Sequence, residues 1–143
     1  MKILIADKLS PKAIAALDKI GAEITSNPDL KAEELSDAIG NANVLIVRST
    51  KVYAETIEAG KSLELIIRAG AGVNNIDLEK ASSSGVYVAN CPGKNSDAVA
   101  ELTLGHIIAC DRRIVDASLD LRSGNWKKKA YQNAAGLKGR TLG

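Results

Sequence analysis

A chain of 143 residues with an apolar fraction of 45% has the size and composition of one ordinary folded domain, not of a disordered segment. Its net charge of +2, with acidic and basic residues mixed along the chain, gives no indication of binding to nucleic acid. Aromatic residues make up only 3% and Phe is absent, so we expect an aliphatic core.

The two cysteines, Cys91 and Cys110, lack the spacing of metal ligands. We therefore predict reduced thiols, no metal site and a cytoplasmic location. The apolar stretch after Met1 is too short for a signal peptide. No apolar run approaches the roughly 20 residues that span a bilayer, so we expect a soluble protein without membrane partners.

The first 90 residues alternate between short apolar runs, typical of strands, and segments with helical spacing. The predicted strands cover residues 3–6, 22–26, 44–47, 65–67 and 86–88. The predicted helices cover residues 11–20, 31–39, 53–59 and 77–84. This alternation is the pattern of a parallel, doubly wound α/β sheet with flanking helices.

The pattern changes at residues 91–95, which we interpret as a hinge. Beyond it, the spacing of apolar residues predicts one long helix from Ser96 to Gly124, about seven turns. Such a helix is too long to cover a small sheet, so we expect it to contact a neighbouring domain or subunit. An extended segment is predicted after Gly124, and the stretch from Leu137 to Gly143 resembles the beginning of another strand.

A glycine-rich stretch joins the predicted strand 65–67 to the helix 77–84. Backbone N–H groups in such a junction can point at a bound anion. Gly70 and Gly72 resemble the start of a dinucleotide fingerprint, but Asn75 stands in the place of the third glycine. A simple tight turn is the alternative.

Two arginines stand at the carboxyl ends of predicted strands, Arg48 after residues 44–47 and Arg68 after residues 65–67. In open α/β sheets this edge forms the crevice that binds ligands. Because a planar guanidinium suits a carboxylate or phosphate, we predict an anion site here. The alternative is a pair of surface arginines with no ligand.

Two other polar residues, His106 and Asp7, are candidates for a functional role. His106, the only histidine, lies within the long predicted helix, and we interpret it as packed or interfacial, not catalytic. Asp7 follows the first strand, as in response-regulator receivers, but a receiver also needs an Asp where this chain has Arg48.

Six motifs now stand out together: Val47–Ser49, Arg68–Asp77, Asn90–Ser96, Ala100–Leu102, Gly124–Trp126 and Gly139–Gly143. In this order and spacing they resemble the D-isomer-specific 2-hydroxyacid dehydrogenase family, most closely its D-3-phosphoglycerate dehydrogenases. The resemblance implies a flavodoxin-like substrate-binding domain over residues 1–90 and a hinge over residues 91–95. Residues 96–143 would begin a truncated nucleotide-binding domain, with the long helix and extended tail leading toward a missing Rossmann domain.

The resemblance also implies roles for individual residues. The substrate would be bound by Arg48, Arg68, Gly70, Ala71, Gly72, Val73 and Asn74. Ala71 and Val99 would approach the cofactor, NAD. The catalytic Arg, Glu and His of the family would lie beyond Gly143, so no catalytic residue is assigned and the isolated chain is expected to be inactive.

The implied function is an NAD-dependent oxidoreductase acting on a small phosphorylated or carboxylate 2-hydroxy acid. The expected reaction converts 3-phosphoglycerate to 3-phosphohydroxypyruvate in serine biosynthesis, a choice that depends on Arg48, Arg68 and the run Lys127–Lys129. Glyoxylate/hydroxypyruvate reductase and D-lactate dehydrogenase of the same family are alternatives. A non-catalytic binding or corepressor-like module is another. We also expect a homo-oligomer, such as a dimer, formed through the helix from Ser96.

Overall fold

The structure, a computed structural model, describes residues 1–143. The chain divides into two compact units, unit 1 (Met1–Lys94) and unit 2 (Asn95–Gly143). The boundary between the units falls within residues 91–95, for which the sequence predicts a hinge.

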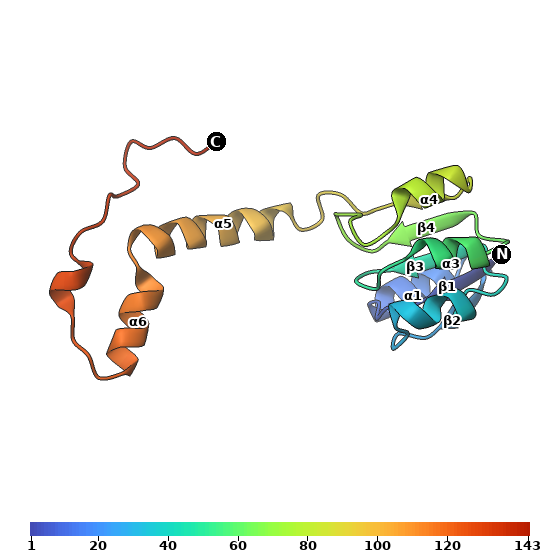
Figure 1. Cartoon of the computed structure of the whole chain (residues 1–143), viewed down its shortest axis with the longest axis horizontal. Coiled ribbons are helices and arrows are strands. Elements are labelled where there is room, and N and C mark those ends of the chain that lie inside the picture. The colour runs from blue at the N-terminus through green and yellow to red at the C-terminus, as the bar shows by residue number, and fades with distance from the viewer. The chain divides into compact units, whose positions relative to one another are not determined.

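Unit 1 contains a five-stranded sheet, seen in Figure 1, whose strands are all parallel and lie in the order β2-β1-β3-β4-β5. This order is that of flavodoxin-like sheets and confirms the predicted fold class. The strands are β1 (Lys2–Ile5), β2 (Glu23–Ser26), β3 (Val44–Val47), β4 (Leu65–Arg68) and β5 (Tyr87–Ala89).

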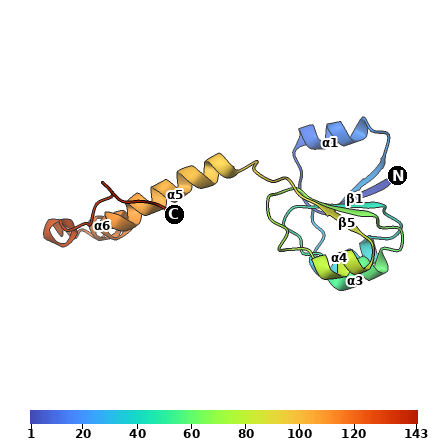
Figure 2. The same ribbon diagram turned by 90° about the horizontal axis from the view of Figure 1, so that it is seen from above.

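Helices cover both faces of this sheet. Figure 2 shows α1 on one face and α3 and α4 on the other. The helices of unit 1 are α1 (Pro11–Asp18), the short 3-10 helix η1 (Ala32–Glu34), α2 (Leu35–Ala38), α3 (Ala54–Ala59) and α4 (Leu78–Ser83). Ser10 caps α1 by accepting the N–H of Ala13 at 3.2 Å, and Asp77 caps α4 by accepting the N–H of Lys80 at 2.9 Å.

Successive side chains of each central strand pack on opposite faces of the sheet. Ile3 and Ile5 contact the layer that contains α1, whereas Leu4 belongs to the larger core that includes residues of α2, α3 and α4. All four residues of β3 are buried, as its unbroken apolar run predicts. Burial of each such side chain contributes about 1.5–3 kcal/mol, which stabilises the position of the carboxyl end of β3.

Unit 2 contains two helices where the sequence predicted one. These are α5 (Ser96–Asp111) and α6 (Ile114–Arg122), so the prediction of a single helix from Ser96 to Gly124 is wrong. The break lies at Arg113, whose φ of 51° is left-handed. The guanidinium of Arg113 lies 4.9 Å from the ring centroid of Tyr131 and donates to the carbonyl oxygen of Ala130 at 3.2 Å. These contacts stabilise a backbone conformation that costs about 1–2 kcal/mol for a non-glycine residue.

The end of the chain also differs from the prediction. The segment predicted to be extended after Gly124 contains a 3-10 helix, η2 (Lys128–Tyr131). The stretch from Leu137 to Gly143, predicted to begin a strand, forms a turn in which the N–H of Arg140 donates to the carbonyl oxygen of Leu137 at 3.1 Å. Unit 2 contains no strand, so the backbone of this stretch has no partner with which to form the hydrogen bonds of a sheet.

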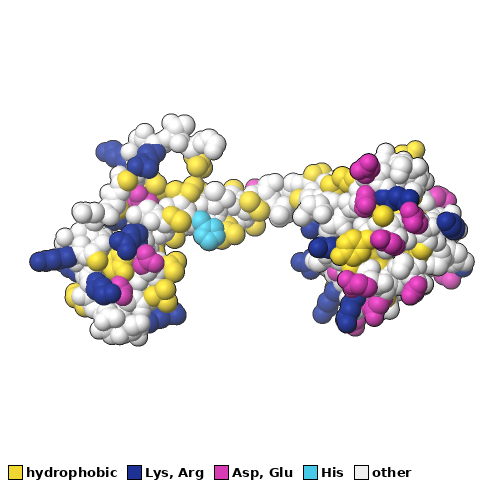
Figure 3. Space-filling view, in the orientation of Figure 1, with side chains coloured by type: hydrophobic (Ala, Val, Ile, Leu, Met, Phe, Trp, Pro, Cys, Tyr) yellow, Lys and Arg dark blue, Asp and Glu magenta, His cyan; other side chains and the backbone are white.

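No residue of unit 2 is buried, and many of its large apolar side chains are exposed. They include Val99, Leu102, Leu104, Ile108, Ile114, Val115, Leu119, Leu121 and Trp126. Figure 3 shows such side chains along the helices of this unit. In neither unit is there a helix with both the length and the apolar character needed to cross a membrane.

Candidate anion-binding site

The carboxyl ends of β3 and β4 bring the two predicted arginines together. The two strands are neighbours, and Val47 is paired with Arg68. Arg48 and Arg68 therefore both lie at the same edge of the sheet. The Nε–H of Arg68 donates to the carbonyl oxygen of Arg48 at 3.0 Å. Arg68 is half-buried and Arg48 is exposed. The guanidinium of Arg68 is therefore held at its Nε by the carbonyl oxygen of Arg48, whereas the Arg48 side chain is exposed to solvent.

The loop after β3 is organised by Asp7, which follows β1. One carboxylate oxygen, Oδ2, accepts the N–H groups of Arg48 (2.7 Å), Ser49 (3.0 Å) and Thr50 (3.0 Å). Burial raises the pKa of Asp7, but these N–H donors together outweigh it and hold the pKa below its usual range. The sequence pattern relates Asp7 only to the acidic residue of a receiver and does not predict this role. The signal for it is the position of Asp7 just after β1, the strand adjacent to β3.

The loop between β4 and α4 presents a row of free backbone donors. No group of the protein accepts the N–H of Ala71, Gly72, Val73 or Asn74. Some carbonyl oxygens of the same loop are in use: the N–H of Cys91 donates to Gly70 at 2.9 Å, and Nδ2 of Asn90 donates to Ala71 at 2.6 Å. Between Ala71 and Asn74 the loop therefore has more unpaired backbone donors than unpaired backbone acceptors, which suits a bound anion.

Asn75 explains why the dinucleotide fingerprint is incomplete. Its Nδ2 donates to the carbonyl oxygen of Thr50 at 2.8 Å, and its own carbonyl oxygen accepts the N–H of Val52 at 2.8 Å. A glycine at this position would lose the side-chain bond. Asn75 thus ties the glycine loop to the loop after β3, which joins the two halves of the site.

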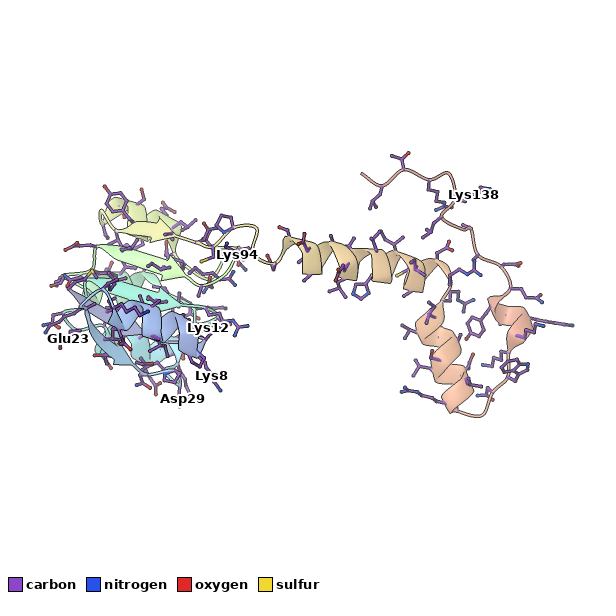
Figure 4. The ribbon with its side chains drawn as sticks, turned by 180° about the vertical axis from the view of Figure 1, so that it is seen from behind. Lys8, Lys12, Glu23, Asp29, Lys94 and Lys138 are labelled. Atoms are coloured by element: carbon purple, nitrogen blue, oxygen red, sulfur yellow. The ribbon has the colours of Figure 1, made fainter.

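Several lysines lie toward this edge of unit 1. Figure 4 shows Lys8 and Lys12 toward the end of unit 1 from which the chain leaves at Lys94, whereas Glu23 lies at the opposite end. Asp29, which follows β2, lies at the same end as the lysines. Lys51, in the loop after β3, adds a further exposed positive charge. The local charge therefore favours an anionic ligand.

Two further residues considered from the sequence lie outside unit 1. Val99, expected to approach the cofactor, is an exposed residue of α5 in unit 2. His106 is also exposed on α5 and forms no hydrogen bond with the protein, so it is not packed within this chain, and an interfacial position stays a prediction. Neither unit contains a group of three or more His, Cys, Asp or Glu side chains that could hold a metal ion.

This geometry can be compared with known proteins. The model of the family described as "D-isomer specific 2-hydroxyacid dehydrogenase, catalytic domain" matches residues 3–139. The chain belongs to this family. It is 44% identical over 144 residues to a hydroxypyruvate reductase of Thermotoga maritima, covering 99% of this chain and 46% of that protein.

The chain is also similar to two phosphoglycerate dehydrogenases. That of Methanocaldococcus jannaschii is 43% identical over 144 residues, which is 100% of this chain and 27% of the relative. The NAD+-bound crystal structure of 3-phosphoglycerate dehydrogenase from Entamoeba histolytica has a TM-score of 0.68 and 36% identity, covering 78% of this chain and 39% of that one. The chain thus spans less than half the length of the relatives that it matches.

Proposed function

We propose that this chain is the substrate-binding part of an NAD-dependent dehydrogenase of D-2-hydroxy acids. One observation carries the proposal: two arginines and four N–H groups without protein acceptors lie together at the carboxyl edge of a parallel sheet. A 2-hydroxy acid always presents a carboxylate, and backbone donors beside a guanidinium are suited to bind it.

In this proposal the glycine loop and the arginines bind the substrate in different ways. The N–H groups of Ala71, Gly72 and Val73, with Asn74 beside them, donate hydrogen bonds to the carboxylate, because no protein group accepts them. Arg68 supplies a positive charge whose orientation is set by its bond to the carbonyl oxygen of Arg48. Each hydrogen bond to a charged group contributes about 1.5–3 kcal/mol.

We propose 3-phosphoglycerate as the substrate and 3-phosphohydroxypyruvate as the product, within serine biosynthesis. Arg48 and Lys51 are exposed next to the carboxylate site and suit the phosphate. The M. jannaschii relative supports this choice by its name. The T. maritima relative, a hydroxypyruvate reductase, is the observation that favours a second candidate, reduction of unphosphorylated hydroxypyruvate.

NAD is the proposed cofactor, and the residues of this chain fit only a part of it. Val99 offers an exposed apolar surface in unit 2. Ala71 in unit 1 is the other proposed cofactor contact, with its N–H assigned to the carboxylate. The loop does not form a complete pyrophosphate cradle, because Asn75 replaces the third glycine and is bound to Thr50. In the proposed reaction NAD supplies the acceptor for the hydride from C2. The chain's own residues hold the carboxylate that fixes the position of C2.

We propose that unit 2 binds a second copy of the chain. Its α5 and α6 expose apolar side chains such as Leu102 (60% exposed) and Leu119 (57% exposed), and apolar surface of this kind is costly in water. The expected assembly is a homo-oligomer, such as a dimer.

Calorimetric titration of the 143-residue chain tests the proposed substrate. We expect 3-phosphoglycerate to bind more tightly than D-glycerate, and Arg48→Ala to weaken the binding of 3-phosphoglycerate by about tenfold or more while changing that of D-glycerate little. Arg122→Ala, which removes an exposed arginine of α6, is the matched control. Equal affinities for the two ligands would favour the hydroxypyruvate candidate. Absence of binding by either would overturn the proposed function.

A further inference from the structure

Asp7 lies beside the candidate site, where it bonds the loop after β3, and it forms no ion pair. The salt bridges of unit 1 join Lys2 to Glu23 and Lys80 to Glu58, and neither involves Asp7. Its charge is balanced instead by three successive backbone N–H groups that converge on one oxygen at 2.7–3.0 Å. Successive N–H groups arranged in this way form a nest, the kind of backbone concavity that binds anions.

The nest after β3 is therefore already filled by an anion that belongs to the protein. The N–H groups of Arg48, Ser49 and Thr50 are not available to a substrate, in contrast to those of the glycine loop. Only side chains can contribute from the loop after β3. The substrate anion is thereby directed to the glycine loop, where the free donors lie.

A series of hydrogen bonds links Asp7 to both arginines. Asp7 holds the N–H of Arg48, and the carbonyl oxygen of Arg48 accepts the Nε–H of Arg68 at 3.0 Å. Thr50, at the far end of the same loop, is held from the other side by Asn75. The peptide units on both sides of Arg48 are consequently fixed, and Arg68 is oriented by one of them.

We infer that Asp7 is a positioning residue of the substrate site: its carboxylate acts as an internal anion that sets the loop Arg48–Thr50 and, through the carbonyl oxygen of Arg48, the guanidinium of Arg68. This inference rests on the proposed function, because it concerns the binding of the same substrate. Asp7 itself does not touch the substrate.

A positioning role for Asp7 and simple electrostatics lead to opposite effects of its removal on the affinity for the substrate. Removal of a negative charge near an anion site strengthens anion binding by Coulomb's law. Loss of a positioning residue weakens it. Asp29, an acidic residue at the same end of unit 1 whose side chain forms no hydrogen bond with the protein, is therefore the matched control.

The experiment measures the affinity of the 143-residue chain for 3-phosphoglycerate in Asp7→Ala, Asp7→Asn and Asp29→Ala. We expect Asp7→Ala to raise the Kd about tenfold, Asp7→Asn to raise it less, and Asp29→Ala to leave it unchanged or lower it. Asp7→Asn keeps an acceptor oxygen and nearly the same volume, so it serves as the test if Asp7→Ala does not fold.

Formate provides a second readout. In the parental chain it competes for the carboxylate site and raises the Kd for 3-phosphoglycerate. In Asp7→Ala formate still competes but also refills the vacated nest, so it raises the Kd less than in the parental chain. Unchanged or tighter binding in both Asp7 variants, or a formate effect of the same size in all proteins, would overturn the positioning role alone. A parental chain that binds neither 3-phosphoglycerate nor D-glycerate would overturn the proposed function, and the positioning role with it.

Discussion

The guanidinium of Arg68 occupies the space in which a side chain at Gly70 would begin. A Cβ built at Gly70 would overlap the Nη1 and Cζ atoms of Arg68, and the φ of Gly70 is not left-handed. The glycine is therefore required for the close approach of a side chain, not for an unusual backbone conformation. Gly70 and Arg68 form one structural element of the candidate site.

Gly70→Ala should displace the Arg68 guanidinium without unfolding the chain, because the clashing atoms are at the end of a flexible side chain. We expect the Kd for 3-phosphoglycerate to rise about tenfold, equivalent to about 1.4 kcal/mol, with a small change in Tm. Calorimetric titration measures the first and differential scanning calorimetry the second. Gly105→Ala, where an added Cβ meets open space, should leave the affinity unchanged. If both variants bind like the parental chain, Arg68 does not contribute to the site.

Asn75→Gly completes the dinucleotide fingerprint in sequence, but it should damage the site. The carbonyl oxygen of Thr50 loses its donor, and we expect a loss of about 1–3 kcal/mol in the free energy of unfolding. Urea denaturation followed by circular dichroism measures this loss. Asn41→Gly is the control, because Asn41 is exposed and its side chain forms no hydrogen bond with the protein. Equal effects of the two substitutions would contradict the bridging role of Asn75.

The stability of the chain should depend on the ionisation of Asp7. Burial raises the pKa of Asp7, but N–H donors from Arg48, Thr50 and Ser49 lower it more, to below its ordinary value of 3.8. Because the folded pKa is lower than the unfolded one, ionised Asp7 stabilises the fold above about pH 4, and this stabilisation is lost as the pH falls through the folded pKa.

The measurement is the free energy of unfolding between about pH 5 and pH 2 for the parental chain and for Asp7→Asn. We expect the parental chain to lose stability more steeply, since the variant has no carboxylate at this position. Glu58 and Asp120, whose pKa values are also lowered, are present in both proteins, so they cancel in the difference. Parallel curves would show that the bonds to Asp7 do not stabilise the loop.

The exposed apolar side chains of unit 2 should mediate association. Leu102→Arg places a charge on α5 and is expected to shift the chain from an oligomer to a monomer. Leu78→Arg, at an exposed position of α4 in unit 1, should leave the assembly unchanged. Size-exclusion chromatography with light scattering measures both masses. A parental chain that is monomeric at high concentration would contradict the proposed interface.

The sequence by itself determined the fold of unit 1 and the location of the candidate site. Short apolar runs that alternate with helical segments specify parallel strands. Each connecting helix brings the chain back to the edge at which the strands begin, so successive strands run in the same direction. For that reason Arg48 and Arg68, which follow two such runs, could be assigned to one edge without coordinates, and the structure places them there. β3 has the same bounds in the prediction and in the structure, because the polar residues Asn43 and Arg48 flank its four apolar residues.

Only the tertiary structure decided which polar groups are used and where the long helix ends. Asp7 and its partners at Arg48–Thr50 are more than 40 residues apart, and Asn75 is 25 residues from Thr50. Such pairings depend on strand order, not on local pattern. The same holds for Arg113, a good helix former whose left-handed conformation is stabilised by Tyr131 and Ala130 of a later segment. Local propensity records none of these contacts, because each forms only when distant parts of the chain come together.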